Sequence, residues 1–557
     1  MNKTGLKKEC LAYFLTGCLM GILCFVAIYG VKVLDFTYDG WLLCTDIDLF
    51  QHYTGWGHFR NDPWQFPFGL ISSLSYPFSV SVIYTDSIPM VAVFFKLLSP
   101  ILPETFQYFG LYGLLSFALM GGTSMVLVHR FIESRVVTVI ASLFFTVSFP
   151  LVFRMYYHTA LASHWLIILA LIFWAYDVYD GSLYKKCIRW GAMGFLCVGI
   201  HSYFLPMVGA IMLFCVIDEC ITFKKLTGKL KTAVIGAIAQ IVSFCMAAIL
   251  NLWLLGGFYG GASAVGGGIG TFESNLNTFF NPLGKGITGI RFPLYYDFQY
   301  EGYGYLGLGM LLLLVIALIG VIGLMVVNKT DIHPVMYFKE HHRQLLMGIL
   351  FILFVLIASG PMFTLGYRKI FAIPLFGRIQ KIADIFRSNG RFIWVSVYAL
   401  MLSVTVIIDR IMRKSMKLVA FSLALIIQIV DLSPEVAIRQ DYFTHERTYT
   451  STWESEPLLP IISDKTQFII MDSSTMMMMD TAYYAFKHGM ITSNFYYARS
   501  IEDVVDEKIA EYEEELIKGN SKADAVYVFL TEGFWAEKYP DLVCYEIGEH
   551  TIGVKRK

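Results

Sequence analysis

Carboxylate, imidazole and indole side chains recur at helical spacing in the segment TDIDLFQHYTGWGHFRNDPWQFP, which follows the first long apolar run of the chain. Asp48, His52 and Trp56 stand four residues apart, so a helix would place all three on one face. With Asp46 nearby, a carboxylate there can take a proton from an acceptor hydroxyl while an aromatic ring packs against a sugar. The alternative is a solvated loop at the membrane interface, where Trp and His are common, and both interpretations stay open.

Further groups that could contact a substrate stand at the ends of other apolar runs. Asp86 precedes the short apolar segment 88–102, where a carboxylate can simply cap a helix; it joins the site only if that segment returns towards Asp48. Glu301 in EGYGYLGLG is another candidate carboxylate. The remaining candidates, each with a lipid headgroup contact as the alternative, are His158, His164, His201 and Tyr203.

The composition indicates that helices in a membrane must position these residues. Hydrophobic residues make up 56% of the chain and charged residues only 15%, against roughly 25% charged in soluble domains. The formal net charge is zero and the basic residues are not massed in one stretch, so no nucleic-acid partner is predicted. The apolar run near the N-terminus exceeds the core of a signal peptide and is expected to be the first span.

Apolar runs predict about eleven spans, so the expected fold class is an all-α polytopic membrane protein. The spans are expected near residues 10–33, 108–129, 136–154, 160–178, 187–201, 203–220, 231–256, 304–327, 345–360, 392–409 and 418–432. With this threading, Lys and Arg clusters fall in alternate turns, which places the N-terminus in the cytoplasm. The expected location is the plasma membrane. The segment 88–102 is short and is expected to lie at the interface.

Long loops and the C-terminal region are predicted on the non-cytoplasmic side. Residues 1–432 form the expected transmembrane domain, with a large first external loop at 34–107. Residues 433–557 are expected to form a small extracytoplasmic α/β domain, because the β-like runs QFIIMD, DAVYVFL and LVCYEI alternate with a helical stretch.

One external loop, 361–391, departs from the usual charge bias because it is rich in basic residues. Guanidinium groups bind phosphate through paired hydrogen bonds, so we expect this loop to bind a lipid phosphate or diphosphate. The alternative is anchoring to ordinary anionic headgroups. The residues expected to bind the phosphate are Arg378, Lys381, Arg387 and Arg391.

The pattern D-x-x-x-H-x-x-x-W at Asp48, His52 and Trp56, with FRNDPWQFP, YTDSIP, EGYGYLGLG and FRSNGRFIW, carries a resemblance. Over nearly its whole length the chain resembles the GT-C superfamily of integral membrane glycosyltransferases and, more narrowly, a DUF6311-like family of bacterial polytopic membrane proteins. The resemblance implies transfer of a sugar from a polyprenyl phosphate or diphosphate to an extracytoplasmic envelope glycan or related acceptor. It also implies that Asp48, or its neighbour Asp46, is the catalytic base.

The leading hypothesis is an inverting glycosyltransferase whose partners are membrane lipid, a polyprenyl-linked sugar and an envelope acceptor. Some superfamily members bind a divalent cation through acidic residues; Asp46 and Asp48 permit a Mg²⁺ or Mn²⁺ site without establishing one. Two other classes remain. A transporter or flippase of a lipid-linked saccharide would need charged groups within the spans, and a non-catalytic envelope-assembly scaffold would depend on residues after 433.

Overall fold

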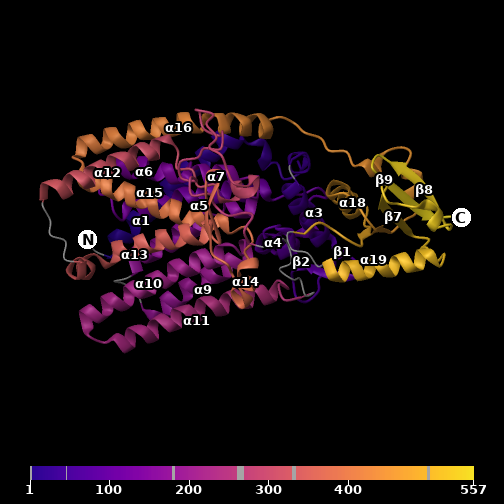
Figure 1. The fold of residues 1–557 in the computed structure, drawn as a ribbon, viewed down its shortest axis with the longest axis horizontal. Coiled ribbons are helices and arrows are strands. Elements are labelled where there is room, and N and C mark those ends of the chain that lie inside the picture. Colours follow the sequence, from indigo (N-terminus) through magenta and orange to yellow (C-terminus); the bar gives the residue numbers. More distant parts are fainter. Residues whose placement is uncertain are drawn as a thin grey trace.

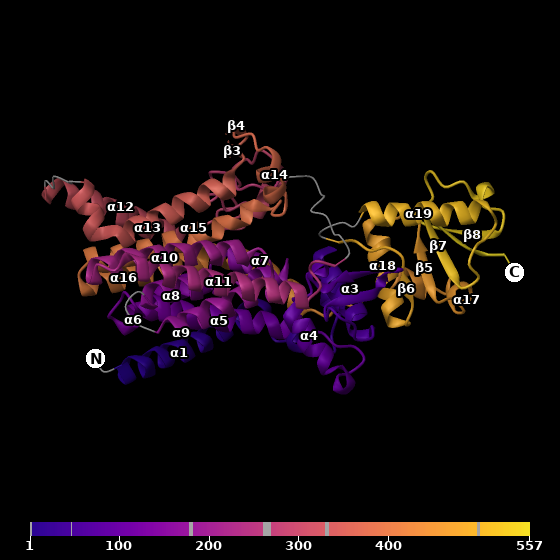
Figure 2. The same ribbon diagram turned by 90° about the horizontal axis from the view of Figure 1, so that it is seen from below.

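The computed structural model describes residues 3–45, 47–177, 182–259, 269–328, 334–497 and 502–556. A bundle of long helices forms one end of an elongated molecule and a small α/β domain forms the other (Figure 1). The N-terminus lies at the far end of the bundle and the C-terminus in the α/β domain, while the first long loop lies between the two bodies (Figure 2).

The long helices follow the apolar runs of the sequence closely. They are α1 (Lys3–Tyr29), α5 (Phe109–His129), α6 (Arg135–Thr146), α8 (Trp165–Asp177), α9 (Leu183–Ile200), α10 (Phe204–Thr227), α11 (Leu230–Leu254), α12 (Leu308–Asn328), α13 (Pro334–Ser359), α15 (Ile393–Ile411) and α16 (Lys414–Thr444). The run predicted at 136–154 is divided, because the chain turns at Ser148 before the short helix α7 (Phe149–Arg154), which has Pro150 in its first turn.

Ten helical segments among the described residues are long and apolar enough to cross a membrane. This is compatible with the predicted multi-pass protein. Helix α9 is an eleventh long helix but is not one of these ten, because its first half carries Lys185, Lys186 and Arg189. The predicted break between the spans at 187–201 and 203–220 is confirmed, since α9 ends at Ile200 and α10 begins at Phe204.

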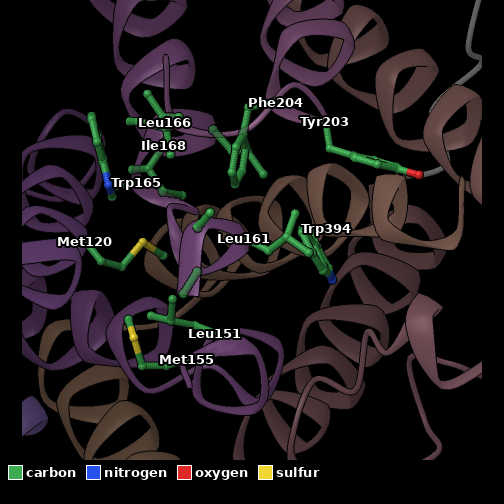
Figure 3. Close-up of a cluster of buried hydrophobic side chains, with 14 of the residues drawn as sticks. Met120, Leu151, Met155, Leu161, Trp165, Leu166, Ile168, Tyr203, Phe204 and Trp394 are labelled. Atoms are coloured by element: carbon green, nitrogen blue, oxygen red, sulfur yellow. The ribbon is translucent and has the colours of Figure 1, made fainter. Parts of the chain in front are cut away.

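The interior of the bundle is packed with large side chains from several helices. Figure 3 shows one such cluster around Leu161 of the 3₁₀ turn η4 (Thr159–Ala162), with Trp165 of α8, Phe204 of α10 and Trp394 of α15 nearby. Tyr203 stands at the edge of this cluster and points its hydroxyl away from it (Figure 3). The outward faces of the helices are also apolar, as contact with lipid requires: α1 exposes Leu11, Leu15, Leu19 and Leu23.

The first loop is an ordered layer at one end of the bundle. It contains η1 (Lys32–Leu34), α2 (Gly40–Leu43), α3 (Ile47–Asn61), strands β1 (Leu70–Ser75) and β2 (Phe78–Ser81), η2 (Val82–Thr85), α4 (Pro89–Leu97) and η3 (Ser99–Ile101). Strands β1 and β2 pair as an antiparallel hairpin. Helix α4 falls within the segment predicted to lie at the interface and is not one of the ten apolar helices.

Two later loops cover the same end. The loop after α11 contains η5 (Asp297–Gly302), and its residues 260–268 lie outside the described ranges. The loop after α13 forms a hairpin of β3 (Met362–Leu365) and β4 (Arg368–Ala372), then α14 (Gly377–Asp384) and the 3₁₀ turn η6 (Asn389–Phe392).

The C-terminal region contains a five-stranded mixed sheet with helices, as its sequence pattern predicts. The strand order is β6 (Ile491–Thr492), β5 (Gln467–Ile470), β7 (Ala525–Leu530), β9 (His550–Lys555) and β8 (Leu542–Ile547). Strand β5 runs parallel to β6 and β7, whereas β9 is antiparallel to both of its neighbours. The accompanying helices include α18 (Thr475–Lys487) and α19 (Glu502–Ile517). Helix α16 continues past residue 432, the predicted domain boundary, before the chain enters this region.

The α/β domain is held against the first loop by polar contacts from α3 and β1. His58 of α3 contacts the carbonyl oxygen of Ala482 through Nε2 (2.9 Å), and Asn61 donates to the carbonyl of Phe486 (2.9 Å). The hydroxyl of Thr492 donates to the carbonyl of Leu74 (2.9 Å). The first loop therefore has the helix bundle on one side and the α/β domain on the other.

Candidate functional site

A cavity of about 390 Å³ lies where the bundle, the first loop and the α/β domain meet. Its size falls within the range of small-molecule sites. Apolar side chains from the ends of α9, α10 and α11 form part of its wall, among them Val198, Leu205 and Leu252. Carboxylates, imidazoles and guanidinium groups line the rest of it.

Half of the predicted site residues meet in this cavity although they come from five separate segments. Asp48 is half-buried on α3, and Asp86 follows η2. The other predicted residues that line the cavity are His158, His201, Tyr203, Arg387 and Arg391. Asp46 lies outside the described residues, and so does the predicted cation site formed by Asp46 and Asp48.

Several predicted residues lie elsewhere. Trp56 is 1% exposed, because the rings of Phe106 and Tyr108 pack against it. Its indole N–H donates to the carbonyl of Phe106 (3.0 Å), and it lines a separate pocket. His164 is fully buried within the bundle, where Nδ1 contacts the hydroxyl of Tyr398 at 2.7 Å. Arg378 and Lys381 are exposed on α14 and do not line the cavity.

Asp86 is the centre of a compact cluster with histidines from three other segments. Its Oδ2 lies 3.3 Å from Nε2 of His158, and its Oδ1 lies 3.5 Å from Nε2 of His201. The ring of His52 stands 4.6 Å from that of His158. His52, Asp86 and His158 each offer a donor atom, and the three donor atoms lie within 4.8 Å of one another.

Close packing between α3 and η2 brings Asp86 to the histidines. Gly55 permits this approach, because a Cβ at that position would overlap the side chain of Thr85. The hydroxyl of Ser87 then donates to the carbonyl of His52 (2.7 Å). Asp86 itself has φ = 52°, the left-handed conformation. The residue before α4 is Ile88, with no side-chain cap, so the helix-capping alternative for Asp86 is wrong.

The imidazoles of the cluster are buried, and burial favours their neutral form. Burial lowers the pKa of His52 to about 3, with a further lowering by His158 and an opposing effect of Asp86. Burial likewise holds the pKa of His158 and of His201 well below the usual range, although the carboxylate of Asp86 raises that of His201. Neutral imidazoles can accept hydrogen bonds or bind metal ions.

The wall of the cavity also carries Arg391, which a buried carboxylate holds in place. Nε of Arg391 donates to Oε2 of Glu301 at 2.6 Å, and Arg154 makes a two-pronged contact with the same carboxylate (2.9 and 3.3 Å). Burial alone would raise the pKa of Glu301, but Arg154 and Arg391 outweigh it and lower the pKa to about 2. Glu301 is predicted to contact the substrate, but it does not line the cavity. Its carboxylate pairs with two arginines instead.

The motif FRSNGRFIW shapes this wall through its backbone. The N–H of Ser388 donates to the hydroxyl of Tyr203 (2.9 Å), and the guanidinium of Arg391 lies 4.8 Å from the centre of the Tyr203 ring. Gly390 touches the backbone of two other segments, because a Cβ there would overlap Phe272 and stand 2.9 Å from Cα of Gly302. Only glycine fits between these two backbone segments without displacing one of them.

The α/β domain contributes one wall residue that the sequence did not point to. Tyr496 lines the cavity, and its carbonyl accepts a hydrogen bond from Nε2 of Gln51 (3.0 Å). Burial raises the pKa of Tyr496, Asp48 raises it further, and Arg387 lowers it, which places all three groups in one electrostatic neighbourhood. The segment NFYYARS carries no motif that predicts this contact.

Residues 18–433 match the family described as a domain of unknown function (DUF6311), and residues 461–555 match the DUF6311 C-terminal domain. The first match alone covers most of the chain. The protein belongs to the DUF6311 family. A comparison with curated proteins found no match.

The family boundaries agree with the anatomy of the cavity. The DUF6311 match begins within α1 and ends within α16, and it contains every predicted residue that lines the cavity, from Asp48 to Arg391. Tyr496 belongs to the DUF6311 C-terminal domain. In this member of the family, the two domains together build one site.

Replacing Glu301 with glutamine should destabilise the fold. The change leaves the buried guanidinium of Arg154 without a compensating charge, and breaking a buried pair costs about 3–5 kcal/mol. Thermal unfolding of the purified protein in detergent should show a clearly lowered midpoint. The matched control is Asp297→Asn in the same turn, whose side chain is 98% exposed and 3.9 Å from its partner Arg291. Equal midpoints for the two variants would contradict the structural role of Glu301.

Proposed function

We propose that this protein is a GT-C-type glycosyltransferase of the plasma membrane, which transfers a sugar from a polyprenyl-linked donor to an extracytoplasmic envelope acceptor. One observation carries the proposal. The carboxylates Asp48 and Asp86 and the guanidinium groups of Arg387 and Arg391 line the same cavity at the end of an apolar helix bundle. A proton acceptor and a phosphate-binding group are what this transfer requires.

The proposed orientation places the N-terminus in the cytoplasm. The cavity and the α/β domain then lie on the extracytoplasmic side. The arrangement of the lining residues suits a donor that enters from the membrane. Val198, Leu205 and Leu252 can contact the first part of the polyprenyl chain, whereas Arg387 and Arg391 can bind its phosphate. This assignment narrows the predicted phosphate site to two of its four basic residues. The exposed Arg378 and Lys381 remain candidates for contact with anionic headgroups.

In the proposed reaction, a carboxylate takes the proton of the acceptor hydroxyl as its oxygen attacks the anomeric carbon. The bond between that carbon and the donor phosphate breaks, and the lipid phosphate leaves with the electron pair. Attack from the face opposite the leaving group inverts the anomeric configuration. Asp48 is the proposed base, as the family resemblance implies, and Asp86 contacts His158 and His201. Arg387 and Arg391 would stabilise the negative charge that develops on the leaving phosphate.

The Asp48→Asn variant should lose transfer activity, because an amide cannot accept the proton. The expected loss is roughly 10²–10⁴-fold in turnover. The assay incubates purified protein with labelled polyprenyl-linked sugars and envelope extract, and identifies the product by mass. Glu104→Gln is the control, since Glu104 is an exposed carboxylate in the same loop and lies outside the cavity. Full activity in Asp48→Asn would remove Asp48 from the mechanism.

The Arg387→Ala variant should bind the lipid-linked donor more weakly, because a charge-assisted contact to phosphate is lost. The Michaelis constant for the donor should rise roughly tenfold to a hundredfold. The matched control is Arg378→Ala, an exposed arginine of the same loop that does not line the cavity. If both variants retain the donor affinity of the unaltered protein, the phosphate-binding assignment fails.

A further inference from the structure

We infer that His52, Asp86 and His158 form a binding site for a first-row transition-metal ion such as Zn²⁺. This site uses other residues and other ligand chemistry than the Asp46 and Asp48 pair that the sequence suggests. The inference concerns the same cavity as the proposed transferase but does not depend on it, because metal binding is measured without any sugar donor.

The separation of the donor atoms suits a small metal ion. Ligand atoms about 2.0–2.1 Å from a tetrahedral ion stand about 3.4 Å from each other. Oδ2 of Asp86 and Nε2 of His158 are 3.3 Å apart. One ring nitrogen of His52, one ring nitrogen of His158 and one carboxylate oxygen of Asp86 all lie within 4.8 Å of one another. A small rotation of the His52 ring about its side-chain bonds would bring the third ligand into place.

His52 is the observation that a simple hydrogen-bonded cluster leaves unexplained. Its side chain is 1% exposed, yet neither ring nitrogen has a hydrogen-bond partner among the described residues. Burying a polar group without a partner costs free energy, and such groups are rare in folded proteins. A metal ion between His52 and Asp86 would satisfy one nitrogen, which is the role that buried imidazoles serve in metal sites.

His201 orients the carboxylate rather than supplying a fourth ligand. Its Nδ1 accepts the backbone N–H of Tyr203 (3.2 Å). In the neutral ring the proton is then on Nε2, which faces Oδ1 of Asp86 at 3.5 Å. Such a contact fixes the orientation of a ligating carboxylate while leaving Oδ2 for the metal. Three protein ligands leave one position of a tetrahedral ion open, as in catalytic sites.

The donor set also selects the class of metal. Two imidazoles and one carboxylate favour borderline ions such as Zn²⁺, whereas Mg²⁺ and Ca²⁺ prefer oxygen ligands. A bound Zn²⁺ acts as a Lewis acid towards an oxygen ligand at its open position. Asp86 and His158 line the cavity together with Asp48, Arg387 and Tyr496, so an ion that they hold would lie at the cavity wall.

The test is the metal content of protein purified with a tag free of histidine and measured by elemental mass spectrometry. After loading with Zn²⁺ and removal of excess metal, the unaltered protein should retain one ion per chain. The variants His52→Gln and Asp86→Asn should retain much less, and His445→Ala, which alters an exposed histidine, should retain the full amount. Zn²⁺ should also raise the unfolding temperature of the unaltered protein and have little effect on the two variants.

Two results would overturn the site: a loaded, folded protein without retained metal, or full retention in both folded variants. If the variants do not fold, the site is tested by Co²⁺ substitution in the unaltered protein. A tetrahedral Co²⁺ absorption spectrum that Zn²⁺ abolishes supports the site, and its absence argues against it. If the His52→Gln and Asp86→Asn variants retain the full amount of metal but lose transfer activity, the metal site is contradicted and the proposed function is not.

A second groove, at the opposite end of the bundle, carries an independent inference. It has a volume of about 670 Å³ and lies between α5, α8, α13 and α15. We propose that it binds an anionic phospholipid. Its apolar wall includes Leu171, Met347, Phe351 and Val406, and three arginines line it as well: Arg130, Arg343 and Arg410.

The arginines provide the charge that distinguishes this groove from an ordinary lipid-facing surface. Arg343 is paired with Asp218 of α10 (2.6 Å), so its charge is compensated within the protein. Arg130 and Arg410 are both exposed at the ends of their helices, and Arg130 donates Nε to the carbonyl of Ala175 (3.3 Å). Basic pockets between spanning helices bind the headgroups of anionic lipids, while the apolar wall contacts the acyl chains.

Native mass spectrometry with added phosphatidylglycerol and phosphatidylcholine tests this groove. The unaltered protein should bind more phosphatidylglycerol, and Arg130→Gln with Arg410→Gln should weaken that binding roughly fivefold for each arginine. Gly348→Trp should also reduce it, because the ring would fill the groove. Apart from its chain neighbours and its own helix backbone, no atom of the described residues lies within 4 Å of a Cβ at Gly348. Arg413→Gln, an exposed arginine outside the groove, is the control. Equal binding of the two lipids, or unchanged binding in all variants, would overturn the proposal.

Discussion

The buried carboxylate of Glu301 joins three parts of the chain that are far apart in sequence. It pairs with Arg154 at the end of α7 and with Arg391 in η6, and the side chains of all three residues are almost entirely shielded from solvent. Charges can be buried in this way only when they are paired and well bonded. The pairing therefore determines where the loop after α13 returns to the bundle, and with it the position of the basic wall of the cavity.

Two kinds of charged group line the cavity. Asp86 contacts imidazoles that burial keeps neutral, and Arg391 lines the same cavity with Glu301 as its direct partner. This combination suits a reaction in which one group loses a proton while another leaves as an anion. If the two kinds of group were in direct contact, they would neutralise each other. Instead Arg391 uses Glu301, behind the wall, as its partner.

The α/β domain is part of the site and not an appendage to it. Its helix α18 contacts His58 and Asn61 of the first loop, Thr492 of β6 donates to the carbonyl of Leu74, and its Tyr496 lines the cavity. The helix bundle provides the apolar platform, the loops provide the polar groups, and this domain covers one side. Relative movement of the domain would therefore change access to the cavity.

The sequence by itself determined the helices, the sheet region and the end of the molecule where polar groups gather. Those features depend on local properties, namely the length of apolar runs, the period of the pattern and glycine or proline at breaks. The tertiary structure decided which polar groups meet. It brings Asp86 to three histidines, keeps Arg387 and Arg391 in the cavity, and leaves Arg378, Lys381, Trp56 and His164 outside it. Such contacts join separate segments, from 72 residues apart for Asp86 and His158 to 147 for Arg154 and Glu301. Periodicity can name the face of a helix but not the segment that packs against it.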